Sequence, residues 1–321
     1  MKNIDVVALG ELLIDFTSSG LSSQNNPLFE ANPGGAPCNL LAMLAKFNHS
    51  TAFFGKVGND GFGRMLKNKA ESVGVNMNYL KFDDDIHTTL AFVDTLENGD
   101  REFSFYRKPG ADIMLREDEI DEDVIASSKI FHYGTLSLTD EPSRSATLRA
   151  IEYAKKHSVL KSFDPNIRIP LWNSLDKAKE QMSYGLKNCD ILKISDNEIE
   201  FFTGLKDLDK GIDKIISEYK IPLVFATYGR DGSAAYYHGQ KIYVKAFINK
   251  DTIETTGAGD TFDGCVLHFI LEYGLDNLSR EILEKALTYA NAAASIVTTR
   301  KGALCVMPEV DEINNFIKNY K

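Results

Sequence analysis

Short apolar runs alternate with segments of helical periodicity along most of the chain. Residues 4–10 (IDVVALG) and 51–58 (TAFFGKVG) are apolar runs of strand length. Residues 38–47 (CNLLAMLAKF) and 63–74 (GRMLKNKAESVG) repeat apolar positions every three or four residues, as helices do. This order predicts right-handed β-α-β units, and therefore an α/β fold with a mostly parallel central sheet flanked by helices on both faces.

The same alternation continues through the second half of the chain, so we expect one long, continuous sheet. The segments that carry it are KIFHYG (129–134), SATLRAIEYAKKHS (145–158), LKSFDPN (160–166), CDILKIS (189–195), NEIEFFTG (197–204) and PLVFATYG (222–229). No internal repeat, low-complexity tract or linker divides the sequence. We therefore expect residues 1–321 to form a single domain.

Residues 88–109 (TTLAFVDTLENGDREFSFYRKP) interrupt this alternation of strand-like and helical segments. They predict two strands joined by a turn at residues 98–100, because Asn-Gly-Asp between strand-like segments is a hairpin signal. We expect residues 14–35 to add another strand to this hairpin. An insertion of this kind forms an edge extension or a lid, and we expect a small β-sheet lid from about residues 12–33 and 88–110.

Charge and cysteine usage limit the possible partners and the compartment. The formal net charge of -10 argues against nucleic acid and anionic membranes, because the field of the protein repels polyanions. The four cysteines are far apart and form no C-x-x-C pair, so we expect neither a disulfide framework nor a zinc site built on them, and a reduced cytoplasm fits best. Acidic residues interrupt the apolar N-terminal run, and no segment has the roughly 20 apolar residues of a membrane span.

The stretch TTGAGDTFDG (255–264) raises a chemical question. We expect Thr255 or Thr256 to cap a helix that begins near Gly257, because apolar residues then recur at helical spacing as far as Gly274. Backbone N–H groups at a glycine-rich helix start carry partial positive charge and form a cradle for phosphate. This segment is therefore a candidate anion site.

Asp260 is the unusual member of this segment, since an acid inside an anion cradle repels phosphate. One interpretation makes it a general base that removes a proton from a hydroxyl group attacking phosphorus. The other makes it an ordinary first-turn acid that complements the helix dipole. The local sequence favours neither interpretation. Neither Walker A nor G-x-G-x-x-G is present, so P-loop and Rossmann interpretations lose their main support.

Longer segments carry a family resemblance. NPGGAPCNLLAMLAKF (32–47) with FFGKVGNDGFGRML (53–66), and ETTGAGDTFDG (254–264), resemble the two signatures of ribokinase-like (PfkB-type) carbohydrate kinases. The signatures stand in the family's order, and the resemblance covers nearly the whole chain. GELLIDF (10–16), FSFYRKPGAD (103–112) and FDPNIRIPLW (163–172) are most similar to the fructokinase branch. The resemblance implies a ribokinase-like fold with a small β lid.

The resemblance also assigns residues to roles. It implies that Asp260 is the catalytic base. It also implies an anion hole formed by Gly257, Ala258 and Gly259, with Arg168 on the phosphate side of the site. It implies sugar contacts from Asp15, Gly34, Gly35, Asn39, Tyr106 and Arg107. It implies nucleotide contacts from Lys193, Thr227, Gly229, Gly232, Asn291 and Gly302. Glu198 matches a residue that helps to place Mg²⁺ through water, and Glu254 stands at a monovalent-cation position where relatives usually have Asp.

The function implied is ATP-dependent phosphorylation of D-fructose to fructose 6-phosphate in the cytoplasm, with Mg²⁺ and, as an option left open, K⁺. A two-stranded insert has one exposed apolar face, so we expect a homodimer that pairs its lids. Three alternatives stay open: a kinase for 2-keto-3-deoxygluconate, ribose, another sugar or a nucleoside; a sugar-sensing scaffold without chemistry; and an NAD-dependent oxidoreductase. The last is disfavoured by the missing glycine fingerprint.

Overall fold

A nine-stranded sheet forms the centre of the protein, as seen in the computed structural model, which describes residues 2–95 and 101–320. Its order among the described strands is β13-β12-β11-β10-β9-β8-β1-β4-β5. The strand bounds are β1 Ile4–Leu9, β4 Thr51–Gly58, β5 Leu80–Asp83, β8 Ser128–Gly134, β9 Leu160–Asp164, β10 Ile191–Ser195, β11 Leu223–Thr227, β12 Ser233–Tyr237 and β13 Gln240–Val244. Within this sheet, the neighbouring strands β11, β10, β9, β8, β1, β4 and β5 pair in parallel, as the alternating sequence pattern predicted.

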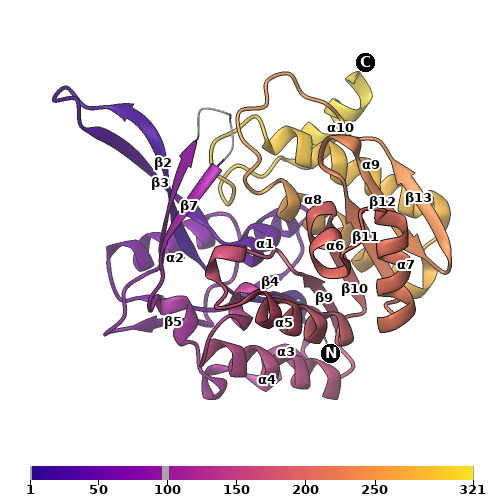
Figure 1. Ribbon diagram of the computed structural model, residues 1–321, viewed down its shortest axis with the longest axis horizontal. Coiled ribbons are helices and arrows are strands. Elements are labelled where there is room, and N and C mark those ends of the chain that lie inside the picture. Colours follow the sequence, from indigo (N-terminus) through magenta and orange to yellow (C-terminus); the bar gives the residue numbers. More distant parts are fainter. Residues whose placement is uncertain (1, 96–100, 321) are drawn as a thin grey trace.

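Helices cover both faces of this sheet (Figure 1). One face carries α1 Ala36–Lys46, α2 Gly61–Ser72, α8 Ala258–Tyr273, α9 Arg280–Val297 and α10 Val310–Asn319. The other face carries α3 Glu122–Ala126, α4 Ser143–Lys156, α5 Leu175–Lys187, α6 Asp196–Thr203 and α7 Leu208–Tyr219. The two hydrophobic cores lie between the sheet and these two layers, which is why all eight residues of β4 are buried.

Local sequence signals explain where several helices begin. Asp60 caps α2 by accepting a hydrogen bond from Gly63 N, and Ser174 caps α5 through Lys177 N. Asp207 and Ser279 cap α7 and α9 in the same way. Each short polar side chain satisfies a backbone donor that has no partner inside the helix. Among the described residues, no helix combines the length and the apolar character needed to cross a membrane.

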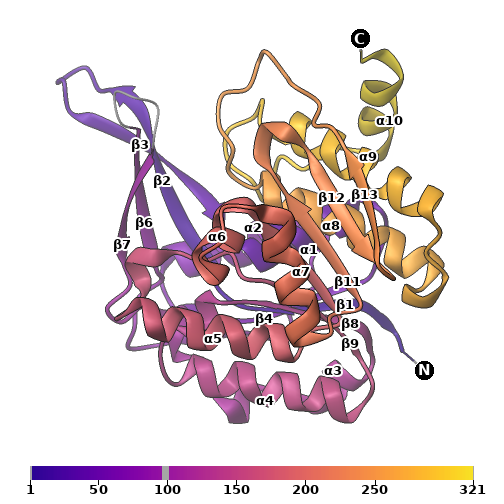
Figure 2. The ribbon, with the colours of Figure 1, turned by 45° about the vertical axis from the view of Figure 1, so that its right-hand side comes forward.

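A second, four-stranded sheet projects from the body in the order β3-β2-β6-β7 (Figure 2). Its strands are β2 Leu13–Leu21, β3 Pro27–Gly34, β6 Leu90–Thr95 and β7 Arg101–Tyr106. The predicted single strand in residues 14–35 is in fact two, because residues 22–26 make a tight turn. There Ser22 Oγ accepts hydrogen bonds from the backbone N–H groups of Gln24 and Asn26. The turn predicted at residues 98–100 lies outside the described residues.

The sheet edge at β12 and β13 was not anticipated from the sequence. These strands pair antiparallel and are joined by a two-residue turn at His238 and Gly239, which have φ of 48° and 73°. Positive φ at both turn residues matches the twist of a hairpin. The signal was present in the sequence as YYHGQKIYV (236–244), with a glycine between two strand-like runs.

Candidate active site

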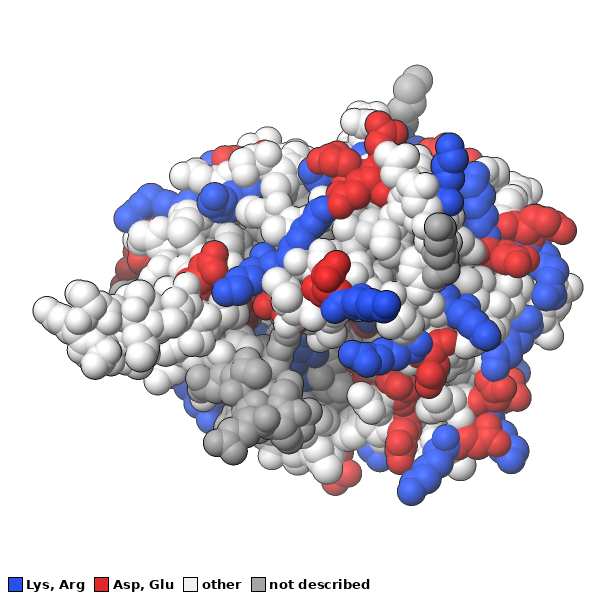
Figure 3. Space-filling view, turned by 90° about the horizontal axis from the view of Figure 1, so that it is seen from above, with Lys and Arg blue, Asp and Glu red and all other residues white. Residues whose placement is uncertain are grey.

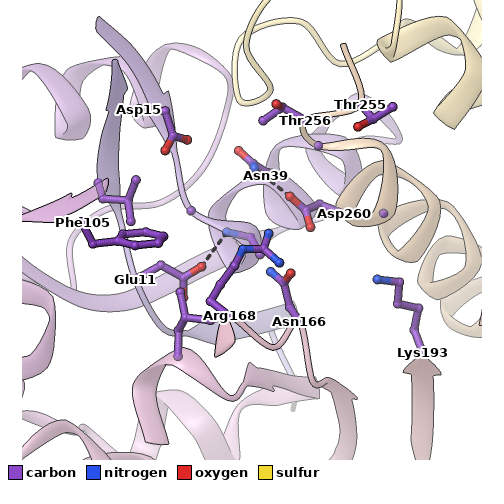
Figure 4. A pocket seen from close by; sticks show the side chains of 16 residues that line it. Glu11, Asp15, Asn39, Phe105, Asn166, Arg168, Lys193, Thr255, Thr256 and Asp260 are labelled. Atoms are coloured by element: carbon purple, nitrogen blue, oxygen red, sulfur yellow. Dashed lines mark hydrogen bonds between the residues drawn. The ribbon is translucent and has the colours of Figure 1, made fainter. Parts of the chain in front are cut away.

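A cavity of about 350 Å³ opens where the carboxyl ends of the central strands face the start of α8 and the projecting sheet. Figure 4 shows the side chains that line it. Asn166 and Arg168 follow β9, Lys193 belongs to β10, and Asp260 lies in the first turn of α8. Crevices at this edge of a parallel sheet are the usual binding sites of α/β proteins. The fold therefore brings together residues that are far apart in the sequence.

The start of α8 corrects the predicted threonine cap. Gly257 is the N-cap, with φ of 76°, and among the described residues no side chain caps this helix. The carbonyl group of Thr255 instead accepts a hydrogen bond from Ala258 N at 3.2 Å. Thr255 and Thr256 both line the cavity. The positive φ favours glycine at this position. The Ala258 N–H group is thus engaged by the backbone, but without a side-chain cap the other first-turn N–H groups stay available to an anion.

Asp260 lies on the cavity wall, where its Oδ2 accepts a hydrogen bond from Asn39 Nδ2 at 2.8 Å (Figure 4). Burial raises the pKa of this carboxyl to about 6, while the Asn39 bond and the charges of Lys193 and Arg168 hold it down. A carboxyl with a pKa near the working pH is well suited to accept and release a proton. The geometry therefore favours the base interpretation of Asp260 over the helix-dipole interpretation.

Lys193 is buried beneath the same helix turn. Its Nζ lies 2.9 Å from Asp164 Oδ2, and it is so close to Gly259 that a Cβ there would lie 3.0 Å from the ammonium. Burial alone would lower its pKa, but the carboxylates of Asp164, Glu198 and Asp263 outweigh burial and raise the pKa above its usual value. The resemblance implied a nucleotide contact for Lys193. The structure places its charge beside the anion cradle and Asp260.

The predicted sugar contacts divide into two groups. Asp15, Gly35 and Asn39 line the cavity as expected. Gly34 lies behind Asp15, because a Cβ at position 34 would sit 2.3 Å from Asp15 Oδ2. Because Gly34 has no side chain, the end of β3 can lie close to the Asp15 carboxylate.

Tyr106 and Arg107 do not face the cavity, and Phe105 takes the expected place in its lining. Side chains alternate along β7, so Tyr106 points to the opposite face and is 66% exposed. Arg107 follows the strand and is buried. It donates hydrogen bonds from Nε to Asp112 Oδ2 at 2.7 Å, from one amino group to Thr139 Oγ1 and from the other to the Leu136 carbonyl. Its guanidinium thus anchors the base of the lid.

Glu11 is a cavity residue that the sequence analysis missed. It is buried just beyond β1, and its Oε1 accepts a hydrogen bond from Ala36 N at 2.9 Å. Burial raises its pKa to about 7. Its position could have been inferred, because an acid directly after an apolar strand lies at the same sheet edge as the other candidates.

Glu198 does not line the main cavity, although it is buried close to it. Its Oε1 accepts a hydrogen bond from Ile167 N at 2.9 Å. Its Oε2 accepts from the backbone N–H and hydroxyl group of Ser195 at 2.9 and 2.8 Å. Glu198 therefore ties the start of α6 to the loop that carries Asn166 and Arg168.

Two of the six predicted nucleotide residues, Gly229 and Asn291, line a second cavity of about 250 Å³, which shares Thr255 with the first. Ala258, predicted for the anion hole, lines this second cavity too. Thr227 and Gly232 line neither cavity. Thr227 pairs with Ser233 between β11 and β12, and Gly232 closely approaches the Val244 carbonyl, so both shape the sheet edge beside the cavity.

Gly302 and Glu254 lie together on the other side of the first cavity. Gly302 N donates to Glu254 Oε1 at 2.8 Å, and both residues line a small space that also includes Asp15. The Glu254 side chain thus joins the loop before α8 to the loop after α9. The structure gives this carboxylate a role in holding two loops together.

Helix α8 begins at Gly257, and its start lies in the same cavity as the Asp260 carboxylate and the cations of Lys193 and Arg168. The cavity opens at the carboxyl edge of a parallel sheet, beside a small β lid, and this arrangement is that of a ribokinase-like fold. The pattern of the pfkB family of carbohydrate kinases matches residues 3–309. The chain belongs to this family and is a sugar kinase, a phosphotransferase with an alcohol acceptor.

Named relatives agree with this assignment. The chain is 41% identical to probable fructokinase-2 of Arabidopsis thaliana, over 98% of this chain and 95% of that protein. Its structure is similar to fructokinase with bound ATP from Xylella fastidiosa, with a TM-score of 0.90, 26% identity and 99% of each chain covered. It is also similar to a Vibrio cholerae fructokinase structure with fructose, ADP and calcium ion bound, with a TM-score of 0.87, 31% identity, and 98% and 99% of the two chains covered.

The Lys193–Asp164 pair leads to a stability prediction. Lys193→Met leaves the Asp164 carboxylate buried without its cation, so we expect the free energy of unfolding to fall by about 3–5 kcal/mol. Adding Asp164→Asn removes the uncompensated charge and should recover much of the loss. Urea denaturation of the two single variants and the double variant measures this. A double variant no more stable than Lys193→Met alone would show that the ion pair is not what stabilises this region.

Proposed function

We propose that this sugar kinase transfers the γ-phosphoryl group of ATP to the 6-hydroxyl group of D-fructose. The relatives with the highest similarity reported above bear the name fructokinase, and one related structure is described with fructose and ADP. The carboxylates of Glu11 and Asp15 line the cavity and suit a neutral sugar, because they accept hydrogen bonds from hydroxyl groups. The observation that carries the proposal is the position of Asp260 at an uncapped helix start inside this cavity.

Asp260 acts as the general base in this proposal. Its carboxylate takes the proton of the sugar hydroxyl group as that oxygen attacks the γ-phosphorus, while the bond from phosphorus to the ADP oxygen breaks. Asn39 holds the carboxylate in place through the 2.8 Å hydrogen bond to Oδ2. The second carboxylate oxygen is then the one that meets the hydroxyl group.

Fixed positive charge stabilises the phosphoryl group during transfer. The N–H groups at the start of α8, from Gly257 to Gly259, carry the positive end of the helix dipole. Lys193 lies against this turn, and Arg168 lines the same cavity. These groups are in place before substrate binds, so little reorganisation is needed when charge develops.

Mg²⁺ fits this site through Glu198 and water. Glu198 Oε2 already accepts two hydrogen bonds from Ser195, but Oε1 accepts one, from Ile167 N, and its second lone pair can accept another from a metal-bound water. Bound Mg²⁺ would neutralise charge on the transferred phosphates. Occupation of the Glu254 region by K⁺ stays a prediction, since that carboxylate already binds Gly302 N. Activity measured with and without potassium tests it.

Asp260→Asn should lower kcat about 10²- to 10⁴-fold, the range for loss of a general base. The amide can still accept the hydrogen bond from Asn39, so fructose binding measured by calorimetry should change little. The fold should not suffer, because the raised folded pKa means that the native state loses stability as the pH rises from about 4 to about 6 and keeps that loss above it, and a neutral amide does not incur it. Turnover close to that of the unchanged protein would remove Asp260 from the mechanism.

The pKa of Asp260 leads to a pH prediction. The base must be ionised to accept a proton, so kcat/KM should fall as the pH drops through about 6. Glu11 also titrates near neutrality, and Glu11→Gln is the matched control. The fall near pH 6 should persist in that variant. A fall that disappears with Glu11→Gln would assign the titration to Glu11 instead.

We also propose that two chains associate through their lids. On the face of the lid opposite the cavity, Phe92 contacts the rings of Phe16, Phe29 and Tyr106. Leu21 is 64% exposed at the tip of the β2–β3 hairpin, and residues 17–29 carry no charge. In Figure 3 this projecting tip is uncharged, while positive and negative side chains are interspersed over the body. Exposed apolar faces of this kind mark association surfaces.

Sedimentation at micromolar concentration should therefore show a dimer, and Phe29→Asp should shift the equilibrium toward monomer. The Asp carboxylate would have to lose its hydration inside the interface. Glu30→Gln, on the neighbouring residue of the same strand, serves as the control and should leave the dimer intact. A monomeric unchanged protein would contradict this proposal.

A further inference from the structure

Two histidines meet at the end of the central sheet opposite the candidate active site. His49 lies just before β4, and His268 lies on α8, eight residues after Asp260. His49 Nε2 and His268 Nδ1 are 2.8 Å apart. Glu272 follows His268 by four residues and so projects from the same side of the helix. One ligand atom from each of these three residues lies within 4.8 Å of the other two.

The surroundings hold both imidazole rings in place. Asp5 Oδ2 lies 3.6 Å from His49 Nδ1, on the side of the ring away from His268. Asp5 is itself held by Ser50, whose N–H and hydroxyl group both donate to Oδ2, and by Lys129 at 2.7 Å from Oδ1. A carboxylate behind a histidine, itself hydrogen-bonded, is the arrangement that orients metal-binding imidazoles.

The His268 ring has a different support. It stacks on Phe47, with ring centroids 4.0 Å apart and planes inclined by 3°. A neutral imidazole has a lone pair that can bind a metal ion. Glu272 is exposed, so the group remains open to solvent on that side.

We propose that His49, His268 and Glu272 bind one Zn²⁺ ion. Two imidazole nitrogens and one carboxylate, with water as a fourth ligand, form a donor set that suits tetrahedral zinc. Mg²⁺ and Ca²⁺ prefer oxygen ligands and do not match a pair of nitrogens. The tetrahedral geometry separates ligand atoms by about 3.3 Å, so the histidines move apart slightly and the flexible Glu272 side chain turns inward.

Proton positions are consistent with binding. Asp5 attracts the Nδ1 proton of His49, which leaves His49 Nε2 with its lone pair directed at His268. His268 Nδ1 then carries a proton and donates it to His49 Nε2 in the 2.8 Å hydrogen bond. When zinc binds, that proton passes through solvent to His268 Nε2, and no net charge change of the rings is required.

A metal ion here would join α8 to the segment between α1 and β4. Its two histidine ligands, His49 and His268, are 219 residues apart in the chain. The same helix carries Asp260 at its other end, about 12 Å along the axis from His268. Zinc would thus stabilise the helix that presents the proposed base, and the ion would lie outside the chemical site. The proposal rests on these side chains alone and does not depend on which sugar the kinase uses.

The test is zinc binding by the purified full-length protein, measured by competition with a chromophoric chelator in the presence of excess Mg²⁺. We expect one zinc per chain, and we expect Co²⁺ as a spectroscopic probe to give the strong visible absorption of a tetrahedral site. Glu272→Gln should weaken binding without risk to the fold, since this residue is exposed. His268→Gln should abolish it. Asp5→Asn should weaken it by about 10- to 100-fold through the support of His49.

His238→Gln is the matched control, because this exposed histidine lies on the β12–β13 turn away from the group. It should bind zinc as the unchanged protein does. Zinc should also raise the melting temperature of the unchanged protein and of His238→Gln, but not that of His268→Gln. The proposal is overturned if the unchanged protein binds no zinc, or if Glu272→Gln and His268→Gln bind it as tightly as the control.

Discussion

The buried ion pair of Lys193 and Asp164 lies under the first turn of α8, and the arrangement of the site depends on it. Four carboxyl groups, those of Asp164, Glu198, Asp260 and Asp263, interact with this one ammonium group. Without it, the acids would face one another across a site that must also accept the phosphates of a nucleotide. Lys193 therefore makes it possible to keep Asp260, the proposed base, at the helix start that we propose binds phosphate.

The lid shows how one strand pattern serves two surfaces. Along β2 and β7, alternate side chains face the cavity, so Asp15 and Phe105 line it while Phe16 and Tyr106 point to the other face. The inner face contributes the Asp15 carboxylate and the Phe105 ring to the cavity wall. The outer face collects aromatic rings and leaves apolar groups exposed. The proposed sugar contacts and the proposed association of two chains would thus use opposite faces of the same four strands.

Much of the fold was predictable because long apolar periods dominate the sequence. The parallel strands and the helices that follow them appear where the periodicity placed them. Of the candidate site, Asp15, Gly35, Asn39, Arg168, Lys193, Gly257, Gly259 and Asp260 were named from the sequence and line one cavity. Their motifs stand at strand ends and at a helix start, and the topology of a parallel sheet brings such positions together.

The errors arose where one residue changes the direction of a side chain. Tyr106 and Arg107 were assigned to the sugar, but strand alternation turns Phe105 inward and the end of β7 leaves Arg107 bound to Asp112. The threonine cap of α8 was wrong because Gly257, with its positive φ, occupies the cap position. Glu11 stands at a recognisable position directly after an apolar strand, but the local pattern does not show that its side chain is buried in the cavity wall. These details depend on tertiary contacts rather than on periodicity.

The central claim is that this site phosphorylates fructose. It is tested most directly by comparing kcat/KM with Mg-ATP for fructose, ribose, 2-keto-3-deoxygluconate, adenosine, fructose 1-phosphate and fructose 6-phosphate, with ADP release as the readout. The account predicts the highest value for fructose and fructose 6-phosphate as the product. Preferred turnover of another acceptor, or no turnover of any of them, would contradict it.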